Sequence, residues 1–443
     1  MAHRKELTAI VLVFVLALEI RLIYQAASVV DTPIRADSAK YVDAAYNLRH
    51  FGVYSLDRPR KDNRPPQSNT DLAPGYPLFI SLFLHDNKLW GSGILKVQAV
   101  MGSLVSVSAL LLARMALPFP WAVAAGIMTA ASPHLVAMDG YFLSESLFTF
   151  ILMCGIVLTA LTWRYRRYSI SFAAGLILAL SSQVRAVSLL LPFFLALAFL
   201  FTAEGKRPLA WKTIGHSLCF AIAFLTIAGA HKWFMRAVSI PQQAAMVAMA
   251  PHKGFRDVGK VIRGIQFCLI PPEFFIQGVD HVYARHGHRE YRNPTKTPFQ
   301  DRPLRYLQWG LYAKLITMWH WDDLFNGDVY IYPMLRKGFE ENMFLKTVHR
   351  SMRILHWPLF FLAMAALPMF WVRRRLKMQP DREGVLLIPA MAFVYFLLLL
   401  WLISWITRYT IPVRPVSYVL ACASLYWLWS SVGNRFPNIR GTA

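Results

Sequence analysis

Charged side chains are scarce in this sequence. Only 16% of its 443 residues are Asp, Glu, Lys or Arg, whereas soluble proteins average about 25%. Hydrophobic residues make up 56% of the chain, and several apolar runs are long enough for an α-helix to cross a bilayer. This composition excludes the water-soluble enzyme folds and predicts an all-α polytopic membrane protein.

Cysteine is also rare, and the glycine-rich motifs of nucleotide-binding proteins are missing. The four cysteines are Cys154, Cys219, Cys268 and Cys422. Three of them lie inside apolar runs, and no two form a close pair. We therefore predict neither a disulfide framework nor a zinc site. The lack of a Walker or dinucleotide-type phosphate cradle argues against a nucleotide-sugar donor and against ATP-driven transport.

Three histidines gather in one polar stretch, at His281, His286 and His288. A metal site would also need a carboxylate or a further histidine at a suitable position, and the spacing does not supply one. We expect no cofactor, and a divalent metal ion stays open as an alternative that the sequence does not support.

The formal net charge is +23, a value that would also suit a nucleic-acid-binding protein. Many of the basic residues, however, lie in short loops between apolar runs, where they act as orientation signals in membrane proteins. Such residues also attract anionic lipid headgroups. The sequence thus predicts the membrane as a partner and no nucleic acid.

Ten apolar runs have the length and composition of membrane spans. The first follows a short basic start, and its Arg21 is expected to snorkel toward the outer interface. Asp139, between two later runs, is expected to be a loop residue. The ten runs are 7–30, 93–113, 119–136, 142–162, 170–185, 187–203, 213–232, 353–372, 384–404 and 411–431.

Lysine and arginine are concentrated in alternate loops. Basic residues fill the loops at 164–167 and 373–377, whereas the loops at 132–141 and near Arg185 have almost none. The positive-inside rule places the basic loops and both termini in the cytoplasm. We expect a multi-pass protein of the inner (cytoplasmic) membrane.

The spans divide the chain into an N-terminal transmembrane region with a first external loop, a large external loop region and a C-terminal transmembrane region, at 1–232 (loop 31–90), 233–350 and 351–443. The large external region contains two interrupted apolar segments, 258–279 and 304–321, which we expect to be surface or re-entrant helices. If either segment crossed the membrane, the topology would change.

The stretch 34–43 follows the first span directly and predicts a short amphipathic helix on the membrane surface. Tyr41 and Ala45 recur on one face, and Gly52 ends the helix. Near its start is Asp37, for which two roles remain open. Asp is favoured as a helix N-cap, and a carboxylate just above the headgroups can also be a reactive group. The two roles can coexist, because capping fixes a carboxylate in place.

Four short motifs follow one another along most of the chain. They are residues 35–41 (RADSAKY), residues 73–79 (APGYPLF), Ala131-Ser132-Pro133 with residues 143–148 (LSESLF), and Thr407-Arg408-Tyr409 with Pro412 and Pro415. In this order they resemble the GT-C superfamily of glycosyltransferases, which includes the dolichyl-phosphate-mannose protein mannosyltransferases and the bacterial lipid A aminoarabinose transferases. The resemblance implies a GT-C-like fold with interfacial helices in the first external loop.

The resemblance also implies roles for particular residues. The acid of the family's first external loop matches Asp37, which is therefore expected to be the catalytic base. Many members have two adjacent acids at this point, whereas this chain has Asp37-Ser38, so the motif gives no support to a metal site.

Five further residues are expected to bind substrate. Tyr41 lies in the helix of the first external loop. Glu145 matches an acid of the family pattern, with an ion pair to Arg185 or Arg408 as the alternative. Arg408 and Tyr409 lie at the outer end of a span, where they either bind the donor phosphate or anchor the helix at the interface. Arg185 is a second candidate for the phosphate.

These expectations describe an inverting glycosyltransferase with its active site on the outer (periplasmic) face. The donor would be a sugar on a polyprenyl phosphate, and the acceptor a hydroxyl of a lipid, a protein or a polysaccharide. A ligase of whole lipid-linked glycans remains an alternative. A lipid or solute transporter is a further alternative, although transporters often show internal repeats and charges near the bilayer midplane, and this sequence shows neither.

Overall fold

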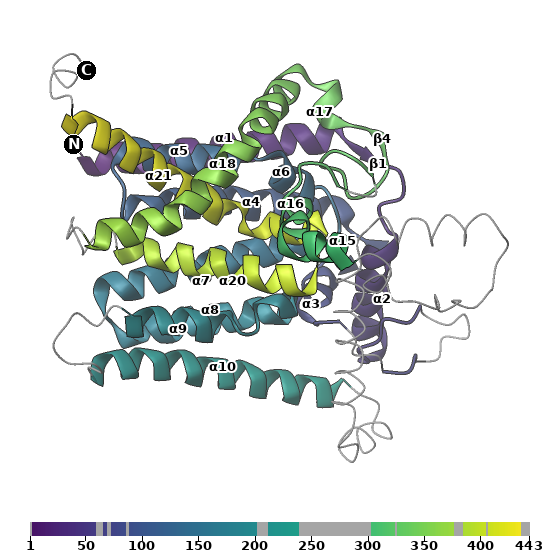
Figure 1. The fold of residues 1–443 in the computed structure, drawn as a ribbon. Helices are drawn as coiled ribbons and strands as arrows, with labels where there is room; N and C mark the ends of the chain where they lie inside the picture. Colours follow the sequence, from purple (N-terminus) through teal and green to yellow (C-terminus); the bar gives the residue numbers. More distant parts are fainter. Residues whose placement is uncertain are drawn as a thin grey trace.

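The long apolar runs form helices that lie side by side along one direction (Figure 1). They are seen in a computed structural model, which describes residues 2–58, 65–68, 72–85, 88–201, 211–238, 303–323, 326–375, 384–404 and 406–435. The predicted segment 258–279 and the three clustered histidines lie outside these residues.

Seven of the ten predicted spans coincide, among the described residues, with helices long and apolar enough to cross a membrane. Two of them begin with a 3₁₀ turn, η3 (Gly384–Leu386) or η4 (Thr407–Val413). The seven helices are α1 (Ala2–Ala27), α4 (Gly91–Arg114), α7 (Glu145–Tyr165), α10 (Trp211–Ala237), α18 (Met343–Arg375), α20 (Leu387–Ile403) and α21 (Arg414–Arg435).

The other three predicted spans are shorter apolar helices, so the prediction of about ten full-length helices was too high for the described residues. They are α5 (Phe119–Ala130), α8 (Tyr168–Val184) and η1 (Ala186–Ser188) followed by α9 (Leu191–Phe201). The run 119–136 is divided because Pro133 disfavours a helical conformation at Ser132, which has an extended backbone. A separate short helix, α6 (Pro133–Met138), begins there.

The helices pack in a continuous series. α10 packs on α8 and α9, α8 packs on α7, and α7 packs on α4. α4 in turn contacts α1, α5 and α21, and α21 packs on α18. Buried apolar side chains from these helices form one large core cluster.

The connections at one end of the bundle form a cap of short elements. α2 (Ala36–Phe51) and α3 (Gly75–Ser81) lie at the end opposite the start of α1 and the end of α21 (Figure 1). β1 (Val29–Val30) pairs antiparallel with β4 (Met334–Arg336), and β2 (Leu84–His85) pairs with β3 (Lys88–Leu89). The β1–β4 pair attaches the segment before α18 to the end of α1. As predicted, α2 ends at Gly52, whose φ of 63° suits glycine.

The interrupted segment 304–321 is helical up to Met318. It consists of α15 (Pro303–Gln308), a π-helical turn η2 (Trp309–Ala313) and α16 (Lys314–Met318). Its Lys314 is buried, and Nζ donates a hydrogen bond to the Leu402 carbonyl oxygen at 3.4 Å. Trp401 donates from Nε1 to the Gly310 carbonyl oxygen at 2.6 Å, so this helix is joined to the end of α20. The next helix, α17 (Gly338–Glu341), leads into α18.

Arg21 does not snorkel to the interface, and Asp139 is not a solvated loop residue. Both side chains are buried, and Arg21 Nε donates to Asp139 Oδ2 at 2.6 Å. Gly102 of α4 makes room for the pair, because a Cβ at that position would lie 2.0 Å from Asp139 Oδ2. A buried charge is tolerated only when it is paired, and here the partner comes from the C-terminal end of α6.

Candidate active site

The start of α2 is shaped by Ser38 rather than by Asp37. The helix N-cap is Arg35, whose backbone N–H donates to Ser38 Oγ at 2.8 Å. The Ser38 hydroxyl also donates a hydrogen bond to the Pro33 carbonyl oxygen at 2.9 Å. Ala36 follows the cap with a positive φ of 47°. The N-cap role for Asp37 is therefore wrong, and its carboxylate is left to point away from the helix backbone.

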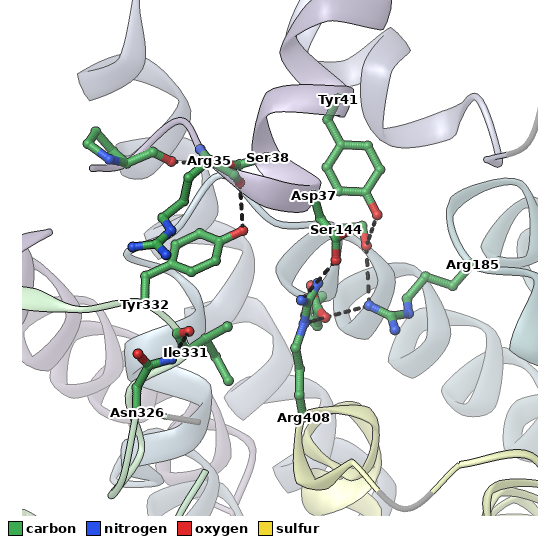
Figure 2. A network of polar contacts seen from close by, with 12 residues as sticks. Arg35, Asp37, Ser38, Tyr41, Ser144, Arg185, Asn326, Ile331, Tyr332 and Arg408 are labelled. Carbon is green, nitrogen blue, oxygen red and sulfur yellow. Dashed lines mark hydrogen bonds and ion pairs between the residues drawn. The ribbon is translucent and has the colours of Figure 1, made fainter. Parts of the chain in front are cut away.

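Asp37 belongs to a network of four charged side chains from four separate helices or helix ends (Figure 2). Arg408 NH1, on η4, lies 3.1 Å from Asp37 Oδ2. Arg408 Nε also donates to Glu145 Oε1, at the first residue of α7. Arg185, at the end of α8, completes the network with NH1 2.5 Å from the same Glu145 oxygen. The structure thus brings together four of the six candidate residues.

The members of this network differ in their access to solvent. The Glu145 side chain is fully buried, the Arg185 and Arg408 side chains are 12% and 13% exposed, and the Asp37 side chain is 42% exposed. Glu145 makes both ion pairs that were considered as its alternative role. Its Oε2 has no hydrogen-bond partner within the described residues. Glu145 therefore holds the two arginines from the buried side, while Asp37 is the carboxylate of the network that solvent reaches.

The other two candidate residues position Arg185. The Tyr409 ring lies under its guanidinium, with CZ 4.8 Å from the ring centroid. Ser144 Oγ accepts from Arg185 NH1 at 3.3 Å and lies 3.2 Å from the Tyr41 hydroxyl. Burial, reinforced by the negative charge of Glu145, raises the pKa of the Tyr41 phenol above its usual value. Tyr41 is consequently a neutral hydrogen-bonding group at physiological pH.

Two neighbours of the site were not identified from the sequence. The Tyr332 hydroxyl donates to the Arg35 carbonyl oxygen at 3.1 Å, and the Arg35 guanidinium lies over the Tyr332 ring with CZ 5.7 Å from its centroid. Figure 2 shows this pair on the side of Asp37 away from Arg185. Tyr332 is 297 residues from Arg35 in sequence, and no motif marks it. The β1–β4 pairing brings the two together.

The site offers cations and carboxylates rather than a metal-binding cage. Across the described ranges, no three His, Cys, Asp or Glu side chains are grouped closely enough to hold a metal ion. The two negative charges of the carboxylates equal the two positive charges of the arginines, so the network has no net charge. Arg35 is exposed and has no carboxylate partner within the part of the chain that the structure describes. It adds the positive charge next to Asp37.

No protein-family model matches this sequence, and no curated protein matches it either. Solved structures give distant likenesses. The oligosaccharyltransferase AglB of Archaeoglobus fulgidus, solved with an inhibitory peptide and a dolichol-phosphate, aligns with 97% of this chain at 16% sequence identity and a TM-score of 0.49. The apo form of the Archaeoglobus fulgidus oligosaccharyltransferase aligns with 97% of this chain at 15% identity and a TM-score of 0.47. In both cases this chain covers only 52% of the solved protein, about half its length.

Proposed function

We propose that this protein is a GT-C glycosyltransferase that moves a sugar from a polyprenyl phosphate to an acceptor hydroxyl. The observation that carries the proposal is the exposed Asp37 carboxylate, which is linked through Arg408 to the buried Glu145. Three of the four members of the network, Asp37, Glu145 and Arg408, belong to stretches that resemble the GT-C superfamily, and Arg185 lies outside those stretches. Motifs that are distant in sequence thus supply one constellation at the end of the bundle.

In the proposed reaction Asp37 is the general base. Its carboxylate accepts the proton of the acceptor hydroxyl while the hydroxyl oxygen attacks the anomeric carbon of the donor sugar. The bond from that carbon to the phosphate oxygen breaks on the opposite face, and the polyprenyl phosphate leaves with the electron pair. The configuration at the anomeric carbon is inverted. No acid is needed for a leaving group that departs as a stable anion.

The leaving phosphate needs positive charge in fixed positions. Arg408 and Arg185 present guanidinium groups that suit phosphate oxygens, and Glu145 holds both in place. When a phosphate approaches Arg408, it competes with Asp37 for the NH1 donor. Loss of that hydrogen bond leaves Asp37 Oδ2 free to accept from the acceptor hydroxyl. Arg35 balances the added negative charge, because the four-residue network alone is neutral.

The proposed active site faces the periplasm, with both chain termini in the cytoplasm. α2 and α3 lie at the end of the bundle opposite the start of α1 and the end of α21 (Figure 1). The basic residues 164–167 lie at the far end of α7 from Glu145. Under the positive-inside rule that far end is cytoplasmic, which leaves Asp37 outside, within reach of a lipid-linked donor in the outer leaflet.

The function can be tested by lipid analysis of a deletion strain. We expect the strain to accumulate a sugar-carrying polyprenyl phosphate and to lose one residue from a surface glycan. Wild-type protein should reverse both changes, whereas Asp37→Asn should not, because Asn cannot accept the proton. Asp43→Asn, on the same helix and outside the ion-pair network, is the matched control and should behave as wild type.

Two results would contradict this proposal. A deletion strain with unchanged polyprenyl-phosphate sugars and unchanged glycans would rule out the proposed reaction. Full reversal by Asp37→Asn, at wild-type protein levels in the membrane, would leave the reaction in place and remove Asp37 as its base.

A further inference from the structure

A groove lies between α1 and α5, away from the candidate active site. Its volume is about 480 Å³, and its walls are mostly apolar. Basic side chains occur only among the residues of the first turns of α1. The residues that define it best are Arg4, Lys5, Leu12, Val13, Val123 and Ile127.

The basic end of the groove carries charge that the described residues do not neutralise. Arg4 and Lys5 are exposed, and neither forms an ion pair with a described residue. The neighbouring acid, Glu6, is already engaged, because its Oε1 lies 2.7 Å from Arg114 NH2. Two positive charges are therefore available at the end of the groove formed by the first turns of α1.

The length of the groove matches one leaflet of a bilayer. From Lys5 to Leu16, the groove residues of α1 extend over about 16 Å at a rise of roughly 1.5 Å per residue. This is about half of the roughly 30 Å hydrocarbon thickness of a membrane. The basic end lies at the start of α1, and α2, the helix that contains Asp37, lies at the opposite end of the bundle (Figure 1). A ligand of this groove would thus be far from the candidate active site.

We propose that this groove binds one anionic phospholipid. The phosphate lies against Arg4 and Lys5, and one acyl chain lies along the apolar walls between Leu12 and Ile127. Basic pockets between membrane helices on the cytoplasmic side are suited to anionic headgroups, which are abundant in that leaflet. The groove combines unpaired cations with apolar walls whose length matches one leaflet. This combination favours a lipid over a soluble anion. The inference does not depend on the proposed glycosyltransferase activity.

The charge requirement can be measured on the purified full-length protein in detergent micelles. Native mass spectrometry would follow the binding of phosphatidylglycerol and of phosphatidylcholine with the same acyl chains. We expect phosphatidylglycerol to bind more tightly to wild type, and Arg4→Gln/Lys5→Gln to weaken it about 20-fold, as expected for the loss of two cations near a lipid surface. Arg164→Gln/Arg167→Gln removes the same charge from exposed residues outside the groove, and should change the affinity less than twofold.

The apolar channel needs a separate test, in which the charge is unchanged. Leu12→Trp fills a groove position, and Leu7→Trp enlarges a side chain of similar exposure outside the groove. We expect Leu12→Trp to reduce phosphatidylglycerol binding several-fold and Leu7→Trp to leave it unchanged. Two results would overturn the proposal. One is equal binding of phosphatidylglycerol and phosphatidylcholine to wild type. The other is an equal loss of affinity in Arg4→Gln/Lys5→Gln and Arg164→Gln/Arg167→Gln.

Discussion

Arg408 has two carboxylate partners on two different atoms. Its Nε donates to Glu145 and its NH1 to Asp37, an arrangement that the planar guanidinium permits and an ammonium does not. Because Glu145 is fully buried, removal of Arg408 leaves it with Arg185 as its remaining cation. A residue that seemed from the sequence to be either a phosphate ligand or an interfacial anchor is thus also the link between the buried and the exposed acid.

We expect Arg408→Ala to lower the free energy of unfolding by about 3–5 kcal/mol, as is usual when a buried ion pair loses one member. Arg408→Ala/Glu145→Gln should recover part of this loss, because Asp37, Glu145 and Arg185 together carry one net negative charge in Arg408→Ala, and Gln at position 145 removes it. Arg408→Lys should be less destabilised than Arg408→Ala but should use the donor poorly. Thermal unfolding of the purified proteins measures the first two effects, with exposed Arg49→Ala as control. A double variant no more stable than Arg408→Ala would show that the charge balance is unimportant.

Arg35 offers a second test at the level of one side chain. As the cation beside Asp37 without a carboxylate partner in the described ranges, it is expected to act on the donor phosphate. Arg35→Gln should raise the KM for the polyprenyl-phosphate sugar roughly 10-fold, a typical effect for a charge-assisted hydrogen bond, with little change in kcat. Arg49→Gln, at the other end of α2, is the control. An equal KM in the two variants would exclude a phosphate contact at Arg35.

At the scale of helices, the Arg21–Asp139 pair explains why α1, α4 and α6 approach closely. The residue that permits the approach is Gly102, where a Cβ would lie 2.0 Å from Asp139 Oδ2 and 2.4 Å from Arg21 Nε. Gly102→Ala must therefore separate the pair or move α4 away from it. In an open helical position the same substitution is favourable, because alanine has the higher helix propensity by about 1 kcal/mol.

We expect Gly102→Ala to destabilise the protein by about 3 kcal/mol or more, through disruption of a buried ion pair. Gly229→Ala is the matched control, because it lies in α10 and a Cβ there meets nothing within 4 Å. Thermal unfolding in the same detergent compares the two. If Gly102→Ala unfolded at the same temperature as Gly229→Ala, the close approach of these three helices would not be needed for stability.

Sequence predicted the positions of the helices better than their ends and partners. Within the described residues, run length located the seven helices of spanning length and three shorter apolar ones, because long apolar runs have few other stable conformations in a membrane. Run length overestimated the length of the helix in 119–136, because the break at Ser132-Pro133 is a local backbone effect inside an apolar run. It misplaced Arg21, because a lone arginine in such a run looks like a snorkelling residue until its partner Asp139, 118 positions away, is known.

For the site, sequence motifs named the residues but not their contacts. Asp37, Glu145, Arg185 and Arg408 were each proposed from a local pattern, and the structure places them in one network. Tyr332, Arg35 and Ser144 were missed as contributors, because side chains that orient or flank a neighbouring group have no characteristic spacing. Their contribution depends on β1–β4 pairing and on the packing of α7 against α8, which are long-range features.

At the scale of the whole molecule, the orientation in the membrane decides which substrates reach Asp37. The structure gives exposed positions for a labelling test. Lys40 on α2 and Leu335 on β4 are exposed at the site end of the bundle, and Ser169 is exposed at the start of α8 at the other end. Single cysteines would be introduced at these three positions after the four native cysteines have been replaced.

We expect an impermeant thiol reagent to label Lys40→Cys and Leu335→Cys in intact cells, and Ser169→Cys only after the membrane has been opened. A permeant reagent should label all three, and the cysteine-free protein should remain unlabelled. The reverse pattern would place Asp37 in the cytoplasm, where an outer-leaflet donor cannot reach it. Labelling of Lys40→Cys and Leu335→Cys from opposite sides would contradict the β1–β4 pairing itself. Because Tyr332 reaches Arg35 beside that pairing, the arrangement around Asp37 would then be wrong as well.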